Sequence, residues 1–225
     1  ADRVPREHLF TRARTTEARL MAPTPWNPET TAVVCVECQN GVLGPESVLP
    51  ALAADSSELV SSVRRLLDSA RQFGARVLHA TYEGNLGGRP TGTARLWRVL
   101  GPATAHWAPG TASTAVLPEL LAPTDLVLPR HHGLFPTLDS ELLPVLKGFG
   151  VSTVVLAGVS LNLAITHTAG HVTQAGFDLV VPRDAVGGTP KDYAEQVLDN
   201  TIAVLGRLTT VDQLIGEWTP VTSDR

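Results

Sequence analysis

Short apolar runs rich in β-branched residues recur along the chain and alternate with segments of helical period. The runs occupy residues 32–36, 76–80, 125–128, 153–157, 178–181 and, more weakly, 208–210. Between them, apolar residues repeat every three or four positions, at Leu59, Val60, Val63, Leu66, Leu67 and Ala70 and again at Leu142, Leu143 and Leu146. Continuous apolar strands separated by amphipathic helices are typical of a parallel sheet covered on both faces. The sequence therefore predicts an α/β fold, a three-layer α/β/α sandwich around a six-stranded, mainly parallel sheet of Rossmann-like type.

The size and charge of the chain suit one such domain. With 225 residues, 43% of them hydrophobic, it is long enough to bury one substantial core. Residues 1–28 carry several arginines and prolines, and we expect a surface arm there, ahead of a domain at 29–225. The net charge of −4 argues against nucleic acid as a partner. No apolar run approaches the roughly 18 to 20 residues that span a bilayer, and the charged N-terminus lacks the apolar core of a signal peptide, so we expect a cytoplasmic protein with no membrane partner.

Polar side chains follow four of the predicted strands. They are Glu37, Cys38, Gln39 and Asn40 after the first strand, Thr81, Tyr82 and Glu83 after the second, Arg130, His131 and His132 after the third, and Ser160 and Asn162 after the fourth. Ligands of open parallel sheets bind outside the carboxyl ends of the strands. We therefore expect these residues to converge on one rim that binds a small molecule.

The cysteines and histidines do not predict a metal site. Cys35 and Cys38 are the only cysteines, and their spacing on a strand predicts that they are buried and point to opposite faces, which disfavours a disulfide. A zinc site would need a second pair of ligands. His167 and His171 are four positions apart, but no acidic residue stands between them as in a His-Glu-x-x-His motif. We expect no metal and no cofactor.

Four motifs resemble those of the isochorismatase-like superfamily and follow one another along the chain as the family's motifs do. This superfamily includes isochorismatases, nicotinamidases and carbamoylsarcosine amidase. Residues 33–40, VVCVECQN, are similar to the family's V-I-D-x-Q-N, and residues 158–164, GVSLNLA, to its G-V-x-T-x-x-C. Residues 135–142 resemble F-x-G-T-x-L, and residues 175–185 resemble A-x-x-x-G-Y-x-V-x-V-V-x-D-A. The resemblance runs from about residue 31 to 215. It implies the same sandwich fold, a small-molecule substrate and a homodimer or homotetramer.

The resemblance also implies where a catalytic triad of Asp, Lys and Cys would lie, and this chain has none of the three. Glu37 stands at the acid position, Arg130 or Pro129 at the lysine position, with Arg130 the expected counterpart, and Ala164 at the cysteine position. A methyl group cannot attack a substrate, so cysteine-dependent amide hydrolysis is disfavoured. Isochorismatases also lack the cysteine and resemble an acid catalyst acting on a vinyl ether, which implies Glu37 as the proton donor.

The proton-donor role sets a condition on Arg130. A guanidinium in contact with Glu37 would form an ion pair and the acid would be lost, whereas a few ångströms away it could bind a substrate carboxylate. His131 or His132 could act as acid or base instead. In relatives the peptide corresponding to Val159–Ser160 is often cis.

The predicted pocket has further members and a competing interpretation. We expect the substrate to contact Gln39, Trp107, His131, His132, Phe135, Ser160, Asn162, Leu163 and His167. The leading hypothesis is a hydrolase that acts without a cysteine nucleophile. The alternative is a catalytically inactive binding or scaffold protein on the same fold. A pocket volume below about 300 Å³, or a pocket filled by Leu161 or Leu163, would favour the alternative.

Overall fold

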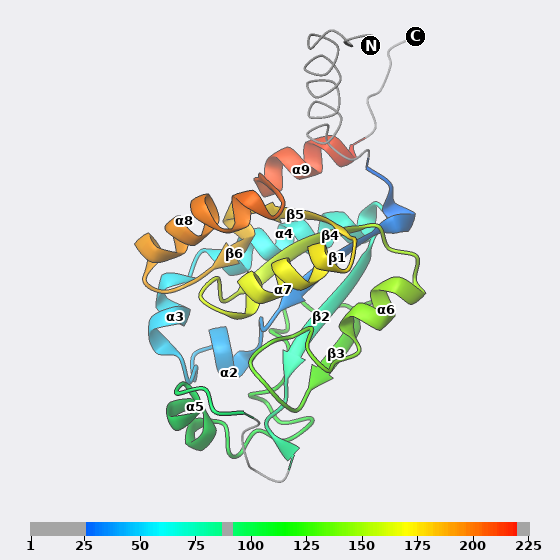
Figure 1. Ribbon diagram of the computed structural model, residues 1–225. Coiled ribbons are helices and arrows are strands. Elements are labelled where there is room, and N and C mark those ends of the chain that lie inside the picture. The colour runs from blue at the N-terminus through cyan, green and yellow to red at the C-terminus, as the bar shows by residue number, and fades with distance from the viewer. Residues whose placement is uncertain (1–25, 87–91, 220–225) are drawn as a thin grey trace, which may run out of the picture.

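A computed structural model describes residues 26–86 and 92–219 of the chain (Figure 1). Within these residues seven strands form one sheet, in the order β3-β2-β1-β4-β5-β7, with β6 paired to β4 and every pair parallel. The strands are β1 (Thr31–Val36), β2 (Arg76–Tyr82), β3 (Leu126–Arg130), β4 (Thr153–Val159), β5 (Asp178–Pro182), β6 (Val186–Gly187) and β7 (Arg207–Thr209). The six predicted strands are all present, and each predicted boundary lies within two residues of the observed one. The prediction missed β6, because two residues are too few to show a period.

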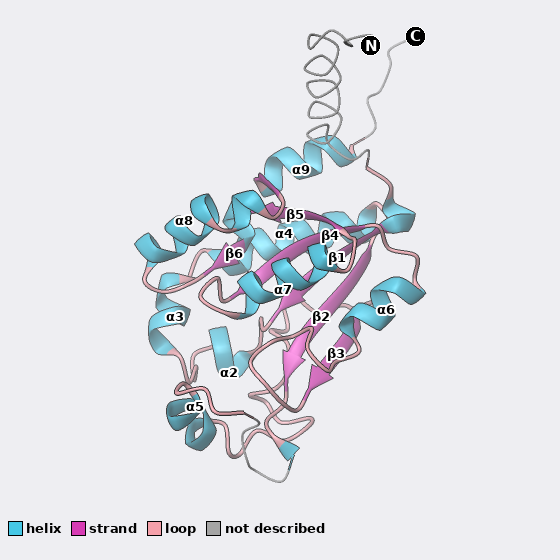
Figure 2. Cartoon of the chain, in the orientation of Figure 1, coloured by secondary structure: helices cyan, strands magenta, loops and turns pink. Residues whose placement is uncertain are grey.

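Helices cover both faces of the sheet, so the predicted three-layer α/β/α sandwich is confirmed (Figure 2). The helices α4 (Leu59–Gln72) and α9 (Val211–Trp218) pack on one face, and α6 (Leu142–Gly148), α7 (Ala164–Gln174) and α8 (Lys191–Asn200) pack on the other. Successive residues of β1 alternate between the two cores, with Val33 and Cys35 in the first and Ala32, Val34 and Val36 in the second. This alternation explains why the buried strand reads as a continuous apolar run.

Shorter helices complete the architecture. Three α-helices lie near the carboxyl ends of the strands (Figure 1): α2 (Asn40–Leu43), α3 (Pro50–Asp55) and α5 (Trp97–Ala103). Three 3₁₀ segments, η1 (Pro28–Thr30), η3 (Arg183–Ala185) and η4 (Ile202–Val204), lie in connections. In the described part of the chain no helix has both the length and the apolar character to cross a membrane.

Most of the predicted N-terminal arm, residues 1–25, lies outside the described residues. Its last part is held to the domain, because the ring of Trp26 stacks on that of Trp218 at the end of α9, with 4.2 Å between the centroids.

The prediction that Cys35 and Cys38 point to opposite faces was wrong. β1 ends at Val36, and Glu37 has a φ of 53°, in the left-handed region, so the alternation of a regular strand stops before Cys38. Both cysteines consequently lie in the core beneath α4, where the neighbouring Cys38 affects the pKa of Cys35. The prediction that they are buried is confirmed, and both are free thiols.

Candidate active site

The carboxyl ends of β1, β2, β3 and β4 meet around a cavity of about 80 Å³. They contribute Glu37, Tyr82, Arg130 and Ser160 to its wall, and α7 adds Ala164 at its first turn. The remaining wall is mostly apolar and comes largely from the short helices and the loops beside them: Val42, Val48, Leu49, Leu52, Leu96, Trp97, Leu100, Thr104, Trp107, Gly133, Leu134 and Leu163. The predicted convergence of strand ends therefore holds for four strands.

Glu37 and Arg130 form an ion pair in the cavity wall. The Arg130 Nη2 donates to Glu37 Oε1, and the two side chains are 5% and 16% exposed, respectively. The guanidinium also lies 5.3 Å from the centroid of the Tyr82 ring, in cation–π geometry. A carboxylate paired in this way carries no proton to donate. The condition that the sequence set for Glu37 as a proton donor, a separation from Arg130, is not met.

The backbone conformation at the end of β1 aims Glu37 at the cavity. Its amide donates to Ala80 O at 2.9 Å, and its carbonyl accepts from the Gln39 amide at 2.9 Å, so the chain turns sharply while remaining hydrogen bonded. Gly158 allows the backbone of β4 to lie close to the end of β1 at Val36. A Cβ there would lie 2.2 Å from Val36 O, and the φ of +102° also disfavours any side chain.

The turn from β4 into α7 forms the opposite wall. The Val159–Ser160 peptide is cis. The carbonyl of Ser160 accepts from the amides of Leu163 and Ile165, at 3.2 and 3.0 Å, which folds the turn and brings Ala164 to the cavity. The methyl group of Ala164, which the motif resemblance aligns with the nucleophile of the amidases, therefore lines the cavity.

Two predicted contact residues use their side chains to hold loops in place. The side-chain amide of the buried Gln39 donates from Nε2 to Tyr82 O at 2.9 Å and to Thr114 O at 2.7 Å, and its Oε1 accepts from the backbone amide of Tyr82 at 2.8 Å. Asn162 makes a pair of hydrogen bonds with the backbone of Thr189, at 2.6 and 3.0 Å. Neither residue lines the cavity.

The histidines and Phe135 also lie outside the cavity lining. The Phe135 ring stacks on His167 with 3.9 Å between centroids. His132 Nε2 is 2.6 Å from the carbonyl of Asp139, and His131 Nε2 is 4.0 Å from Glu83. Trp107, in contrast, lines the cavity, and its Nε1 has no hydrogen-bond partner among the described residues.

Apart from Trp107 and Leu163, sequence reasoning missed the apolar part of the wall. Leu49 just before α3, Leu52 within it and Leu100 of α5 line the cavity, but as isolated apolar residues in or beside short helices they show no signal that separates a pocket wall from a core. Tyr82 was among the polar residues that the sequence predicted at this rim, and it lines the cavity. Of the two leucines named for a filled pocket, Leu163 lies in this wall and Leu161 does not.

A buried polar network connects α4, β2 and the residue that precedes β3. Asp125 accepts from Arg71 at 2.6 Å and contacts His79 Nε2 at 3.0 Å, and His79 in turn contacts Cys35. Burial opposes ionisation of Asp125, but the hydrogen bonds from Arg71 and His79 outweigh it and keep the pKa of this carboxyl below its usual value. The hydrogen bond with Cys38 lowers the pKa of Cys35 to about 6. Within residues 26–86 and 92–219 no cluster of His, Cys, Asp and Glu side chains has an arrangement that could hold a metal ion.

The chain belongs to the isochorismatase family: residues 31–213 match the isochorismatase domain, a family of hydrolases that act on small molecules. The resemblance found in the sequence motifs is thereby confirmed.

Among individual relatives, the chain is 26% identical over 205 residues to the uncharacterized isochorismatase family protein YecD of Escherichia coli O157:H7, covering 84% of this chain and 96% of that protein. A cysteine hydrolase from Pseudomonas syringae pv. phaseolicola 1448A has a similar structure, with a TM-score of 0.75 and 19% identity over 87% of this chain and 95% of that one. N-carbamoylsarcosine amidase from Thermoplasma acidophilum gives a TM-score of 0.65 with 20% identity, over 81% and 97% of the two chains. At these identities the structural likeness shows the fold.

Proposed function

We propose that the protein is a hydrolase of a small organic substrate that works without a covalent cysteine, with Glu37 as a base and Arg130 as the group that holds it and binds the substrate. The observation that carries the proposal is the Glu37–Arg130 ion pair in a cavity that also contains Ala164. An ionised carboxylate is suited to accept a proton from water. The methyl group of Ala164 leaves the place of a thiol open to that water.

The reaction balances with water as the nucleophile. Glu37 takes one proton from water, and the resulting hydroxide adds to a carbonyl carbon. The oxyanion that forms needs a donor, and the Nε of Arg130 is buried and has no acceptor among the described residues. Glu37 then returns its proton to the leaving group as the tetrahedral species collapses. Hydrolysis of a vinyl ether, the narrower reaction that the family resemblance implies, would require Glu37 to leave Arg130 and take up a proton first.

The cavity limits the size of the substrate. At about 80 Å³ it has room for about five to eight water molecules, since a cavity needs about 10 to 15 Å³ for each. Such a space suits a group of a few heavy atoms. We therefore propose a compact, largely apolar substrate group with one carbonyl or carboxylate. Assembly as a homodimer or homotetramer and a cytoplasmic location stay predictions.

The cavity volume also favours a second function, a non-catalytic binding protein. The volume is below the threshold of about 300 Å³ that the sequence reasoning set for that alternative, and the wall is largely apolar. In this function the ion pair would be a structural part of the wall.

Product release distinguishes the two functions. Proton NMR would follow a panel of isochorismate and small aliphatic amides and esters with the wild type, with Glu37→Gln and with the exposed control Glu119→Gln. Turnover that survives in the control and is lost in Glu37→Gln supports the hydrolase. Absence of turnover, with saturable binding of the same molecules by wild type, supports the binding protein. Turnover that is equal in all three proteins would refute the role of Glu37.

A further inference from the structure

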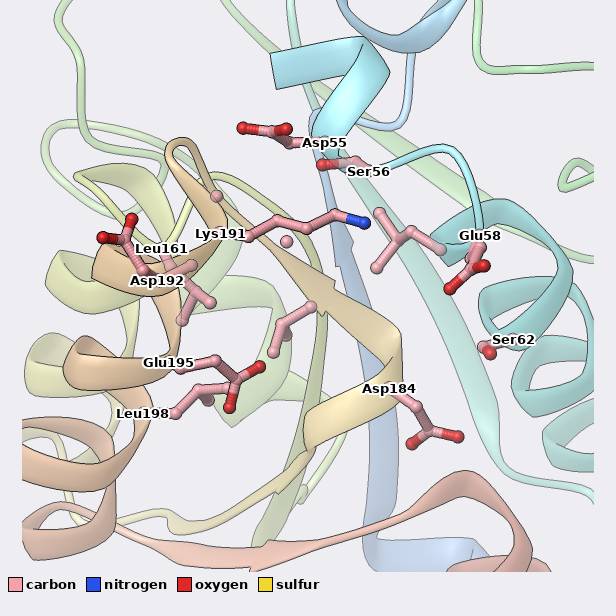
Figure 3. A pocket seen from close by; sticks show the side chains of 15 residues that line it. Asp55, Ser56, Glu58, Ser62, Leu161, Asp184, Lys191, Asp192, Glu195 and Leu198 are labelled. Carbon is pink, nitrogen blue, oxygen red and sulfur yellow. The ribbon is translucent and has the colours of Figure 1, made fainter. Parts of the chain in front are cut away.

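A second cavity, distinct from the one at Glu37, lies between the α3–α4 junction, the β6 segment and the start of α8 (Figure 3). Its volume is about 380 Å³, within the range of cavities that bind small molecules. We propose that this cavity binds a small organic cation, a molecule with two amino groups joined by a short apolar stem.

The charge of the wall is the first support for a cation. Five carboxylates line the cavity, and the single basic residue that joins them in the described structure is Lys191; the acids are Asp55, Glu58, Asp184, Asp192 and Glu195. Arg183 neutralises one of the five, since its Nη2 lies 2.7 Å from Glu195. The described residues form no ion pair with the other four. A concave surface lined by one sign of charge concentrates ligands of the opposite sign.

Hydrogen bonds position three of these acids but do not neutralise them. Asp55 Oδ2 accepts from Thr189 Oγ1 at 2.6 Å, Asp184 Oδ1 accepts from the Val211 backbone amide at 2.8 Å, and Asp192 Oδ1 accepts from the Tyr193 backbone amide at 2.9 Å. These donors are neutral, so they do not offset the negative charge of the carboxylates. Each also keeps an oxygen for which no such partner is recorded in the described structure, and an ammonium group can donate to it.

The hydroxyl of Ser56 is the second, independent support. Ser56 lies in the cavity wall, is 4% exposed, and its Oγ has no hydrogen-bond partner among the described residues. Buried polar atoms without a partner are rare in folded proteins. Gly187 keeps the neighbouring space free, because a Cβ there would lie 2.5 Å from Ser56 Oγ. An ammonium group held by the preceding residue, Asp55, could donate to this hydroxyl oxygen.

The arrangement of the wall favours a diamine over a metal ion. Figure 3 shows the carboxylate groups on different sides of the cavity, with Asp55 on one side and Glu195 and Asp184 on the other. The same wall also contains apolar residues, namely Leu59, Leu161, Val186 and Leu198. A metal ion requires several oxygen ligands at one point, and no acidic cluster of that kind occurs in the described residues. Two separated cations on an apolar stem fit both features.

Lys191 provides an internal test of this inference. Figure 3 shows its side chain extending into the cavity with the ammonium nitrogen at the far end. Its charge would repel a bound ammonium and would compete with it for the same carboxylates. Replacing Lys191 by a neutral side chain should therefore strengthen binding of the cation.

Isothermal titration with 1,4-diaminobutane at low salt would test the proposal on the full chain. We expect saturable binding that weakens at least about tenfold in Asp55→Asn, and severalfold in Glu58→Gln and Ser56→Ala, because each loses a charge or an acceptor. Lys191→Met should bind more tightly than wild type. The monoamine n-butylamine should bind about tenfold more weakly than the diamine, because it lacks the second charge.

Two controls separate this cavity from the rest of the molecule. Glu119→Gln, an exposed acid outside the cavity, should leave binding unchanged. Glu37→Gln should do the same, so that a failed catalytic proposal does not affect this one. Circular dichroism checks that each variant is folded. If Asp55→Asn does not fold, the Glu58→Gln variant is used for the comparison instead. The proposal is refuted if the diamine does not bind, if the cavity variants bind it as the wild type does, or if magnesium ions displace it at equal concentration.

Discussion

The two charges of the Glu37–Arg130 ion pair should be strongly coupled in their effect on stability, and a double-mutant cycle would measure that coupling. The cycle consists of Arg130→Met, Glu37→Gln and the variant with both changes. Each single change leaves the other partner in the wall of the cavity, where Arg130 is 5% and Glu37 16% exposed. Removing one partner of a fully buried pair costs about 3 to 5 kcal/mol, because an uncompensated charge remains. Since Glu37 keeps some access to water, we expect the lower end, about 3 kcal/mol, for each single variant.

The double variant should lose much less than the two single variants together, because neither charge remains. We expect a loss of about 1 to 2 kcal/mol, and hence a coupling energy of about 4 kcal/mol. For a chain of this length, 3 kcal/mol corresponds to a fall in melting temperature of about 6 to 12 °C.

Urea unfolding of the four proteins at one pH gives the free energies of unfolding and the coupling. The exposed pair Arg207–Glu217, with contacts of 2.7 and 2.9 Å, is a matched control, since its partners are 30% and 41% exposed. A cycle of Arg207→Met and Glu217→Gln should give a coupling below about 1 kcal/mol. Losses that simply add in the Glu37–Arg130 cycle would refute the reasoning, because additivity means that the two charges do not interact.

Three further perturbations test the architecture around the site. The pKa of Asp125 is lowered in the folded state. Its contribution to stability is therefore complete above its unfolded pKa of about 3.9 and is lost as the pH falls through the lower folded value. Urea unfolding between pH 6 and pH 2.5 should show a decrease in the free energy of unfolding of the wild type that is smaller in Asp125→Asn. Gly158→Ala should lower the free energy of unfolding by at least about 2 kcal/mol. Gly170→Ala in α7, where a Cβ meets nothing within 4 Å, should raise it by about 0.5 to 1 kcal/mol. Thermal melts that rank the two variants in the opposite order would contradict the geometry. Asn162→Ala removes both hydrogen bonds to Thr189 and should cost about 1 to 3 kcal/mol in urea unfolding, a loss that an exposed Asn200→Ala should not reproduce.

The strands and the layers were predictable because they depend on short-range periodicity, and the family was predictable from the resemblance of four sequence motifs. The alternation of Val33 and Cys35 with Ala32 and Val34 between two cores follows from the period of a strand, and the face of α4 that contains Leu66 follows from the period of a helix. The same period failed at Cys38, where the left-handed backbone of Glu37 ends the strand. Periodicity also missed β6, because its two residues are too few to show a period and form a strand only through their pairing with β4.

The candidate site was predictable only in part. The strand-end rule correctly brought Glu37, Arg130 and Ser160 together, because parallel strands share one carboxyl edge. It also selected His131 and Asn162, which the structure places outside the cavity lining. The rule fixes where a residue stands along a strand but not the direction of its side chain, and that direction depends on loop conformations that have no sequence period.

The sequence by itself determined that residue 164 cannot act as a nucleophile, because the side chain of Ala164 is a methyl group in any conformation. Only the tertiary structure decided that Glu37 and Arg130, 93 residues apart in sequence, are in contact, and that the cavity between them and Ala164 is small. Residue identity limits which reactions are chemically available. Contact and volume depend on distances between separate strands, which are set by the packing of the whole sheet and its helices.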